Sequence, residues 1–302
     1  MDIAFNIYAA VLPVDREKMT HQMFIFWLIL TTGGITMYLS FASFSYFAYF
    51  RKMKQQFFPK TIDPDNEQEL RKQALHEIWI AVCSIPFMAL LMMPAATFSH
   101  RGYSKVYYNV ADYGLAYLLI SPVLFFAFTD FMVYCFHRGL HHPIVYKHVH
   151  KLHHTYKYTT PFSSHAFNPV DGFGQGVPYY IFVFLFPLHN VLFMTLFVLV
   201  NFWTISIHDQ VDFGGHFINT TGHHTIHHEQ FNYDYGQYTT VWDRLGGSYR
   251  PAEQTHQMST LLHACDNQYV DPVYATYHLQ KGYLAGRFKE EAAAQRAKKT
   301  GA

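Results

Sequence analysis

The residues of this 302-residue chain that are best suited to chemistry are its 21 histidines. Fifteen of them lie between His137 and His228, and most of those fifteen fall into clusters with regular spacing. The three clusters are His137-x3-His141-His142, His150-x2-His153-His154 and His223-His224-x2-His227-His228. Because side chains three or four positions apart share one face of a helix, each cluster directs two or three imidazoles at one point.

Acting together, the three clusters supply at least eight imidazole nitrogens. A zinc site uses about four ligands, so this number predicts two metal ions. Imidazole binds zinc, copper, iron and nickel, and the ligand type alone therefore does not select the metal. Histidine tracts that buffer zinc are usually irregular, whereas the spacing here is strict. A non-catalytic zinc-binding membrane protein is the alternative from a different functional class.

Asp130 precedes His137 by seven positions, which is two helical turns along the same face. A carboxylate inside an apolar segment is costly unless it has a partner. We therefore predict that Asp130 holds a ligand imidazole in place, as carboxylates commonly do around metals. An ordinary acid at the end of a helix is the alternative.

Sequence motifs of several other functional classes are absent. There is no HExxH, GxSxG, GxGxxG or Walker sequence, which excludes the usual zinc-protease, serine-hydrolase and nucleotide-binding signatures. No basic stripe suggests binding to nucleic acid. The three cysteines are scattered and form no CxxC pair.

The elements that position the histidines belong to an oily chain, in which 50% of the residues are apolar and 14% are charged. Four long hydrophobic stretches lie at about residues 23–50, 78–98, 113–136 and 177–207. A helix needs about 20 apolar residues to cross a bilayer. The last stretch is too long for one span and contains Pro187, which breaks a helix. We predict an all-α protein of about four membrane spans, the last a broken hairpin, capped by a helical histidine-rich metal domain.

The sequence predicts three regions and an orientation of the chain in the membrane. Residues 1–136 form an N-terminal transmembrane region, residues 125–251 a catalytic region that includes the membrane hairpin at 177–207, and residues 252–302 a tail. Loop 51–76 carries six lysines and arginines, whereas loop 99–112 carries two. The positive-inside rule then places the first loop in the cytosol, and with it the metal site and the C-terminus.

A redox-active metal pair beside a membrane indicates oxygen activation and attack on an unactivated C–H bond of a lipid. That reaction needs two external electrons. The chain has no motif of an electron carrier, so we expect a partner protein to deliver them.

Four stretches resemble one family: "HRGLHHPIVYKHVHKLHH", "TPFSSHAFNPVDGFGQGVPYY", "NFWTISIHD" and "HHTIHHEQFNYDYGQYTTVWDRLGGSYR". They are similar to the sterol C-5 desaturases, or lathosterol oxidases, of the fatty acid hydroxylase superfamily of membrane di-iron enzymes. The resemblance covers about residues 125–251. The histidine clusters alone are typical of the whole superfamily, whereas "TPFSSHAF" and "YGQYTTVWDRLGGSYR" are more specific.

The resemblance implies O2-dependent formation of the C5=C6 double bond of a Δ7-sterol in the endoplasmic reticulum membrane. It implies two Fe2+ ions, with zinc possible in isolated protein, and electrons from NAD(P)H through cytochrome b5 and its reductase. A sterol C-4 methyl oxidase or another lipid hydroxylase of the superfamily is the alternative, because the histidine clusters do not fix how the substrate lies against the oxidant.

The resemblance also implies roles for individual residues. The implied metal ligands are His137, His141 or His142, His150, His153, His154, His208, His223, His224, His227 and His228. Thr160, Phe162 and His165 would contact the sterol. Asn168 stands where the family usually has a histidine before Pro-Val-Asp-Gly, so we assign it a catalytic role that an amide would have to fill.

Overall fold

The computed structural model describes residues 2–51, 67–156, 159–211 and 215–252, and these are mostly helical, as predicted. The predicted tail, apart from Ala252, lies outside the described residues. The all-α prediction needs one small correction. Two short strands, β1 (Val106–Tyr107) and β2 (Leu188–His189), pair in parallel, with Val106 opposite Leu188.

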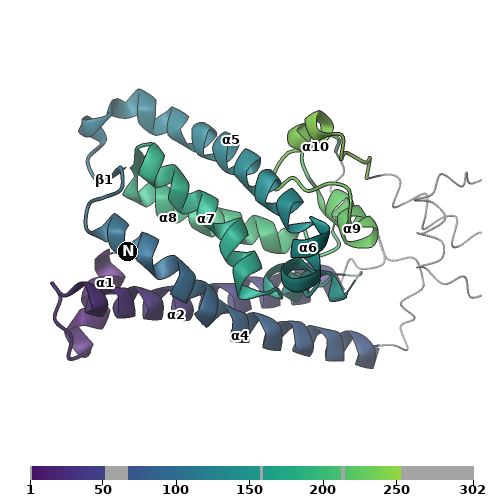
Figure 1. Cartoon of the computed structure of the whole chain (residues 1–302), viewed down its shortest axis with the longest axis horizontal. Coiled ribbons are helices and arrows are strands. Elements are labelled where there is room, and N and C mark those ends of the chain that lie inside the picture. The colour runs from purple at the N-terminus through teal and green to yellow at the C-terminus, as the bar shows by residue number, and fades with distance from the viewer. Residues whose placement is uncertain (1, 52–66, 157–158, 212–214, 253–302) are drawn as a thin grey trace, which may run out of the picture.

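Among the described residues, three helices are long and apolar enough to cross a membrane, which makes this a multi-pass membrane protein. They are α2 (Met19–Ser45), extended by the π-helical turn η1 (Tyr46–Phe50), α4 (Glu67–His100) and α5 (Gly114–Leu140). α2 and α4 lie along each other, while α5 crosses the opposite side of the helical body (Figure 1). Their outward faces are apolar: Trp79 is 67% exposed and Leu119 is 69% exposed, as expected for side chains that face lipid.

The fourth hydrophobic stretch forms a helical hairpin between these long helices (Figure 1). α7 (Pro169–Leu185) and α8 (Asn190–Ser206) have 17 residues each, and the break between them contains Pro187. The break falls where the proline predicts it, but α7 begins eight residues before the predicted start at residue 177. Each hairpin helix is shorter than the about 20 residues of a full span.

Close contact between α4 and α7 depends on two glycines. A Cβ atom on Gly172 would meet the side chains of Met88 and Phe167, and one on Gly176 would lie 2.7 Å from Cε of Met92. A larger residue at either position would force the ends of the Met88 and Met92 side chains, or the ring of Phe167, to move. The packing fixes the face that α7 turns toward the interior.

The short elements gather at one end of the helical body, where α6, α9 and α10 lie together (Figure 1). They follow α5 and α8 in the chain. Their bounds are α6 (Pro143–Val145), η5 (Tyr146–His150), η6 (His153–Thr155), η7 (Pro161–His165), α9 (Thr221–Gln230) and α10 (Val241–Gly246). At the opposite end lie α1 (Asp2–Val11), β1 and the turn η4 (Val110–Asp112).

Candidate metal centre

The end of α5, the turn after α8 and the short elements bring nine histidines of the described chain into two groups, and all of them except the half-buried His141 are buried. The ligand atoms within each group all lie within 4.8 Å of one another. The first group is His137, His141, His150, His154 and His227. The second group is His153, His208, His224 and His228.

The two groups adjoin each other. The ring centroids of His154, in the first group, and His228, in the second, are 4.6 Å apart. α9 contributes to both groups, because His224 and His228 share one face while His227 faces the first group. The arrangement offers two neighbouring metal sites, which is what the histidine count predicts.

Backbone carbonyls fix the orientation of three of these rings. His137 donates from Nδ1 to the carbonyl of Tyr235 at 3.0 Å, and His227 donates from Nδ1 to that of Tyr233 at 2.8 Å. His208 does the same to Thr204 at 2.6 Å. A proton held on Nδ1 leaves Nε2 as a lone pair that points into the group.

A carboxylate holds a fourth ring. Asp171, on α7, accepts from Nδ1 of His150 at 2.7 Å, and both side chains are fully buried. This is the carboxylate support that we predicted for Asp130. Asp130 instead accepts hydrogen bonds from the backbone N–H of Tyr238 and from the hydroxyl of Thr239, and contacts no histidine of either group among the described residues.

The nitrogen positions fit metal ions better than hydrogen bonds. Nε2 of His137 lies 3.2 Å from Nε2 of His150, and both rings already carry their proton on Nδ1. Two facing lone pairs repel unless a cation lies between them. Ligands at about 2.0–2.1 Å from one ion would place their nitrogens about 3 Å apart. In the second group, the corresponding distance between His208 and His224 is 2.9 Å.

Several other buried nitrogens lack a hydrogen-bond partner, which a metal ion would supply. Among the described residues they include Nε2 of His141 and Nε2 of His227. A buried polar atom without a partner costs free energy, so such atoms are rare in a stable fold. The donor set therefore fits two ions held by imidazole.

Burial keeps these imidazoles neutral. It lowers the pKa of His208 to about 3. Burial, together with the neighbouring histidines, lowers the pKa values of His153, His224 and His228 well below the ordinary value. A neutral imidazole is the form that binds a metal.

The structure does not bring His142 or His223 to either group. His142 is exposed at the break between α5 and α6, because the residue before Pro143 is extended rather than helical. His223 is buried at the third position of α9, where its Nδ1 interacts with Thr220 at the N-terminus of the helix. Of the two alternatives His141 and His142, the geometry favours His141.

Asn168 serves as the N-cap of α7. Its Oδ1 accepts from the backbone N–H of Val170 at 2.9 Å, and no metal-group histidine contacts it among the described residues. Asparagine is one of the best residues for this position. The structure therefore gives Asn168 a helix-capping contact three residues before Asp171.

Thr160 and Phe162 contact the long helices α4 and α2. The hydroxyl of Thr160 donates to the buried carboxylate of Glu77 at 2.5 Å, and Ser163 donates to the same carboxylate at 2.7 Å. Phe162 packs against Tyr38. Neither Thr160 nor Phe162 lines the large cavity of the described structure, whereas His165 does.

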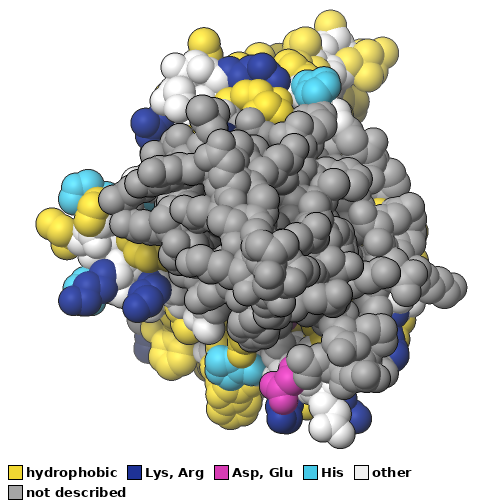
Figure 2. All heavy atoms as spheres, turned by 90° about the vertical axis from the view of Figure 1, so that its right-hand side faces the viewer, with side chains coloured by type: hydrophobic (Ala, Val, Ile, Leu, Met, Phe, Trp, Pro, Cys, Tyr) yellow, Lys and Arg dark blue, Asp and Glu magenta, His cyan; other side chains and the backbone are white. Residues whose placement is uncertain are grey.

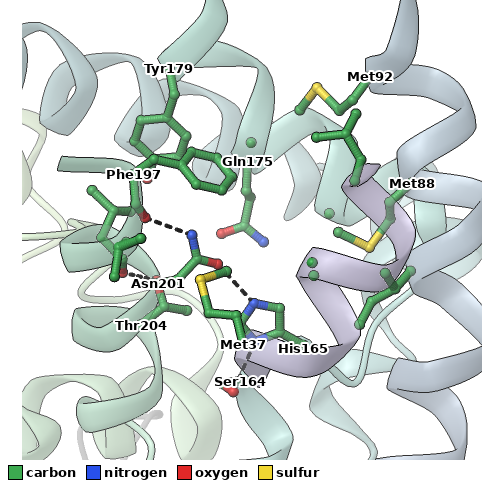
Figure 3. A pocket seen from close by; sticks show the side chains of 18 of the residues that line it. Met37, Met88, Met92, Ser164, His165, Gln175, Tyr179, Phe197, Asn201 and Thr204 are labelled. Carbon is green, nitrogen blue, oxygen red and sulfur yellow. Dashed lines mark hydrogen bonds between the residues drawn. The ribbon is translucent and has the colours of Figure 1, made fainter. Parts of the chain in front are cut away.

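That cavity has a volume of about 990 Å³ and is lined mostly by apolar side chains. It extends from α1, which contributes Ile3 and Ile7, to the histidines, where His137 and His208 line its wall. Figure 3 shows the part of this cavity that contains His165. A long apolar molecule in this cavity would therefore reach both histidine groups.

Comparison with known proteins identifies the family. The fatty acid hydroxylase family model matches residues 122–248. The chain is 43% identical over 250 residues to the Δ7-sterol 5(6)-desaturase of Schizosaccharomyces pombe, covering 82% of this chain and 80% of the relative. It is 42% identical to rat lathosterol oxidase and 41% identical to the human protein, each over 81% of this chain and 80% of the relative.

The chain belongs to the sterol C-5 desaturases. No solved structure matches it. In this sterol C-5 desaturase, the nine grouped histidines and Asp171 lie within residues 122–248, the range that the family model matches. The apolar cavity also uses residues of α1, α2 and α4, which precede that range.

Sequence reasoning missed two residues at this site. Asp171 lies in "NPVDG", within a stretch that carries the family resemblance, but no motif or spacing there assigns it a role. Gln175 follows it by four positions on the same face of α7 and donates to Asp171 at 2.7 Å. An Asp-x3-Gln pair at helical spacing was the available signal.

Proposed function

We propose that this protein converts a Δ7-sterol into the 5,7-diene. The C–H bonds at C-5 and C-6 break and a C5=C6 double bond forms. One O2 takes up the two hydrogens together with two electrons and two protons, giving two molecules of water. The observation that carries the proposal is the pair of histidine groups at the wall of a long apolar cavity, in a chain 41–43% identical to sterol desaturases of yeast and mammals.

The nine histidines would hold two iron ions, which supply the activation of O2 when bound. The protein's own residues do the rest. Tyr235, Tyr233 and Thr204 hold the imidazoles in the metal-binding tautomer, and Asp171 does so for His150. The apolar wall excludes water and places the substrate carbon beside the histidines. In this proposal residues 125–251 form the catalytic region, and residues 1–136 the transmembrane region.

We further propose that the metal site and C-terminus face the cytosol at the endoplasmic reticulum, with the hairpin α7–α8 as the fourth, broken membrane element. Figure 2 shows lysine and arginine side chains around the described part of the histidine end (Figure 2). Exposed residues there include Arg138, Lys147, Lys151 and Arg244. Positive charge at this end supports a cytosolic location. Electrons would come from NAD(P)H through cytochrome b5 and its reductase.

The test is sterol profiling by mass spectrometry in cells that lack their own C-5 desaturase and accumulate Δ7-sterols. We expect the 5,7-diene to appear on expression of the chain. A hydroxylated sterol as the only new product would indicate a hydroxylase instead. Unchanged Δ7-sterol, with the protein present in the membrane and loaded with iron, would refute the proposed function.

A further inference from the structure

The wall of the apolar cavity carries a small polar region next to the first histidine group. Methionines and aromatic rings surround it, among them Met37, Met88 and Phe197 (Figure 3). The side chains of Gln175, from α7, and Asn201, from α8, point into this part of the cavity (Figure 3). Amides in an apolar cavity are costly unless they meet polar partners.

The Gln175 side chain is held in one orientation by Asp171. Its Nε2 donates to Oδ1 of Asp171 at 2.7 Å, while Oδ2 of the same carboxylate accepts from His150 at 2.7 Å. A carboxylate only accepts, so the amide nitrogen of Gln175 must point toward it. The carbonyl oxygen of Gln175 consequently faces the cavity and accepts no hydrogen bond from the described residues.

Asn201 is held in a similar way. Its Oδ1 lies 3.1 Å from Nε2 of His165, and its Nδ2 donates to the carbonyl of Phe197 at 2.7 Å. An amide nitrogen carries two protons, so one remains to donate. The cavity thus offers an acceptor on Gln175 and a donor on Asn201. A single hydroxyl group donates one hydrogen bond and also accepts, so it matches an acceptor and a donor of this kind.

We infer that Gln175, with Asn201, binds the 3-hydroxyl of the sterol and so positions C-5 at the metal site. The inference rests on the proposed function. In a Δ7-sterol a single ring carbon separates C-3 from C-5, so the hydroxyl of a correctly placed substrate must lie close to the histidines. Gln175 meets this requirement, because Asp171 hydrogen-bonds to both Gln175 and His150. Gln175 is a positioning residue in this scheme, and the rest of the sterol extends along the apolar wall toward α1.

The experiment compares two ligands and two variants in the iron-loaded protein, reconstituted in nanodiscs without an electron donor so that nothing turns over. Equilibrium binding is measured for a tritiated 3β-hydroxy Δ7-sterol and for its 3-deoxy counterpart. We expect the wild type to bind the hydroxysterol about tenfold more tightly, as two neutral hydrogen bonds allow. Gln175→Leu should bind the two sterols with nearly equal affinity.

Ser40→Ala is the matched control, because Ser40 is a polar residue of the cavity wall on α2 and is not among the hydrogen-bond partners of Gln175 or Asn201 in the described structure. It should keep the wild-type ratio. If Gln175→Leu also keeps that ratio, or if the wild type does not distinguish the two sterols, the inference is wrong. Should Gln175→Leu fail to accumulate, Asn201→Ala is put through the same comparison, and an unchanged ratio there overturns the shared role of the two amides.

Failure of this inference is distinguishable from failure of the proposed function. Adding the electron donor to the same wild-type preparation tests formation of the 5,7-diene directly. Diene formation with no preference for the hydroxyl would leave the function standing and remove Gln175 from substrate positioning.

Discussion

At the scale of single residues, the adjacent histidines His141 and His142 have different environments: the first is a candidate metal ligand and the second lies at the surface. His141 lies in the first histidine group with a buried Nε2 that lacks a partner among the described residues, whereas His142 is exposed. We expect His141→Ala to lower iron content and to reduce desaturation by more than about 100-fold, since even supporting residues around metals are worth about 10–100-fold. Metal analysis and sterol profiling check this.

His142→Ala is the control for that variant, and it should retain both iron and activity. Equal losses in the two variants would show that the turn around Pro143, rather than the His141 imidazole, is what the substitutions disturb.

A second prediction at this scale concerns the carboxylate of Asp171. Asp171→Asn keeps the size of the side chain but removes the charge that holds His150. We expect iron affinity to fall by about 10–100-fold, measured by metal titration with a competing chelator. Asp130→Asn should leave iron affinity unchanged, because Asp130 bonds to Tyr238 and Thr239. The reverse result would restore the role that the sequence suggested for Asp130.

The regular spacing of the histidines made a two-metal site predictable from sequence, because positions three and four apart share a helical face. The choice of supporting carboxylate was not predictable in the same way. Asp130 lies on the same helical face as His137, as the spacing of seven predicts. The spacing does not predict which segment of the chain packs against that face. In the fold, the loop around Tyr238 occupies that place, and Asp171 arrives from α7 instead.

At the scale of elements, Asn168 shows how a helix start supports the site. Asn168→Ala removes the hydrogen bond to Val170 at the N-terminus of α7 and should lower the free energy of unfolding by about 1 kcal/mol. Thermal unfolding in detergent would measure the loss. Asn168→Asp caps the helix equally well and adds a favourable charge at its N-terminus, so it should be as stable as wild type.

Loss of desaturation in Asn168→Asp, at full stability and iron content, would contradict a purely capping role. It would support the catalytic role that the family resemblance suggested for this position.

Hydrophobic length and Pro187 were enough to predict the long helices and the break in the hairpin. They did not predict where α7 begins, because Pro169 and the Asn168 cap start the helix within a stretch that still contains Asp171. They also did not predict α1, whose ten residues are too few for a span, although its side chains line the cavity. Which elements share a cavity depends on tertiary packing, which a hydropathy pattern does not contain.

At the scale of the whole molecule, the buried histidines make stability depend on pH. In the folded chain they stay neutral, with the pKa of His208 lowered to about 3, whereas in the unfolded chain each takes up a proton below about pH 6.5. The unfolded state therefore binds more protons as the pH falls, and stability is lost below about pH 6.5. Protons also compete with metal ions for the same nitrogens.

We accordingly expect the thermal midpoint of the purified protein to fall between pH 7.5 and pH 5.5, and iron to dissociate over the same interval. Protein stripped of metal by a chelator should show the same direction of change in the thermal midpoint, since the burial of neutral imidazoles does not depend on the metal. A midpoint that is constant over this range would mean that the histidines are already protonated in the fold.

The dipeptide His153–His154 has a further consequence. The first of these neighbours belongs to one histidine group and the second to the other, so a single peptide unit joins the two metal sites. Consecutive Cα atoms are about 3.8 Å apart, and that spacing barely varies. The separation of two ions bound in these groups would therefore be tied to covalent geometry as well as to side-chain packing. Looser packing elsewhere in the membrane region would leave this peptide link intact. Inserting one residue between His153 and His154 would instead change the spacing of the two metal sites.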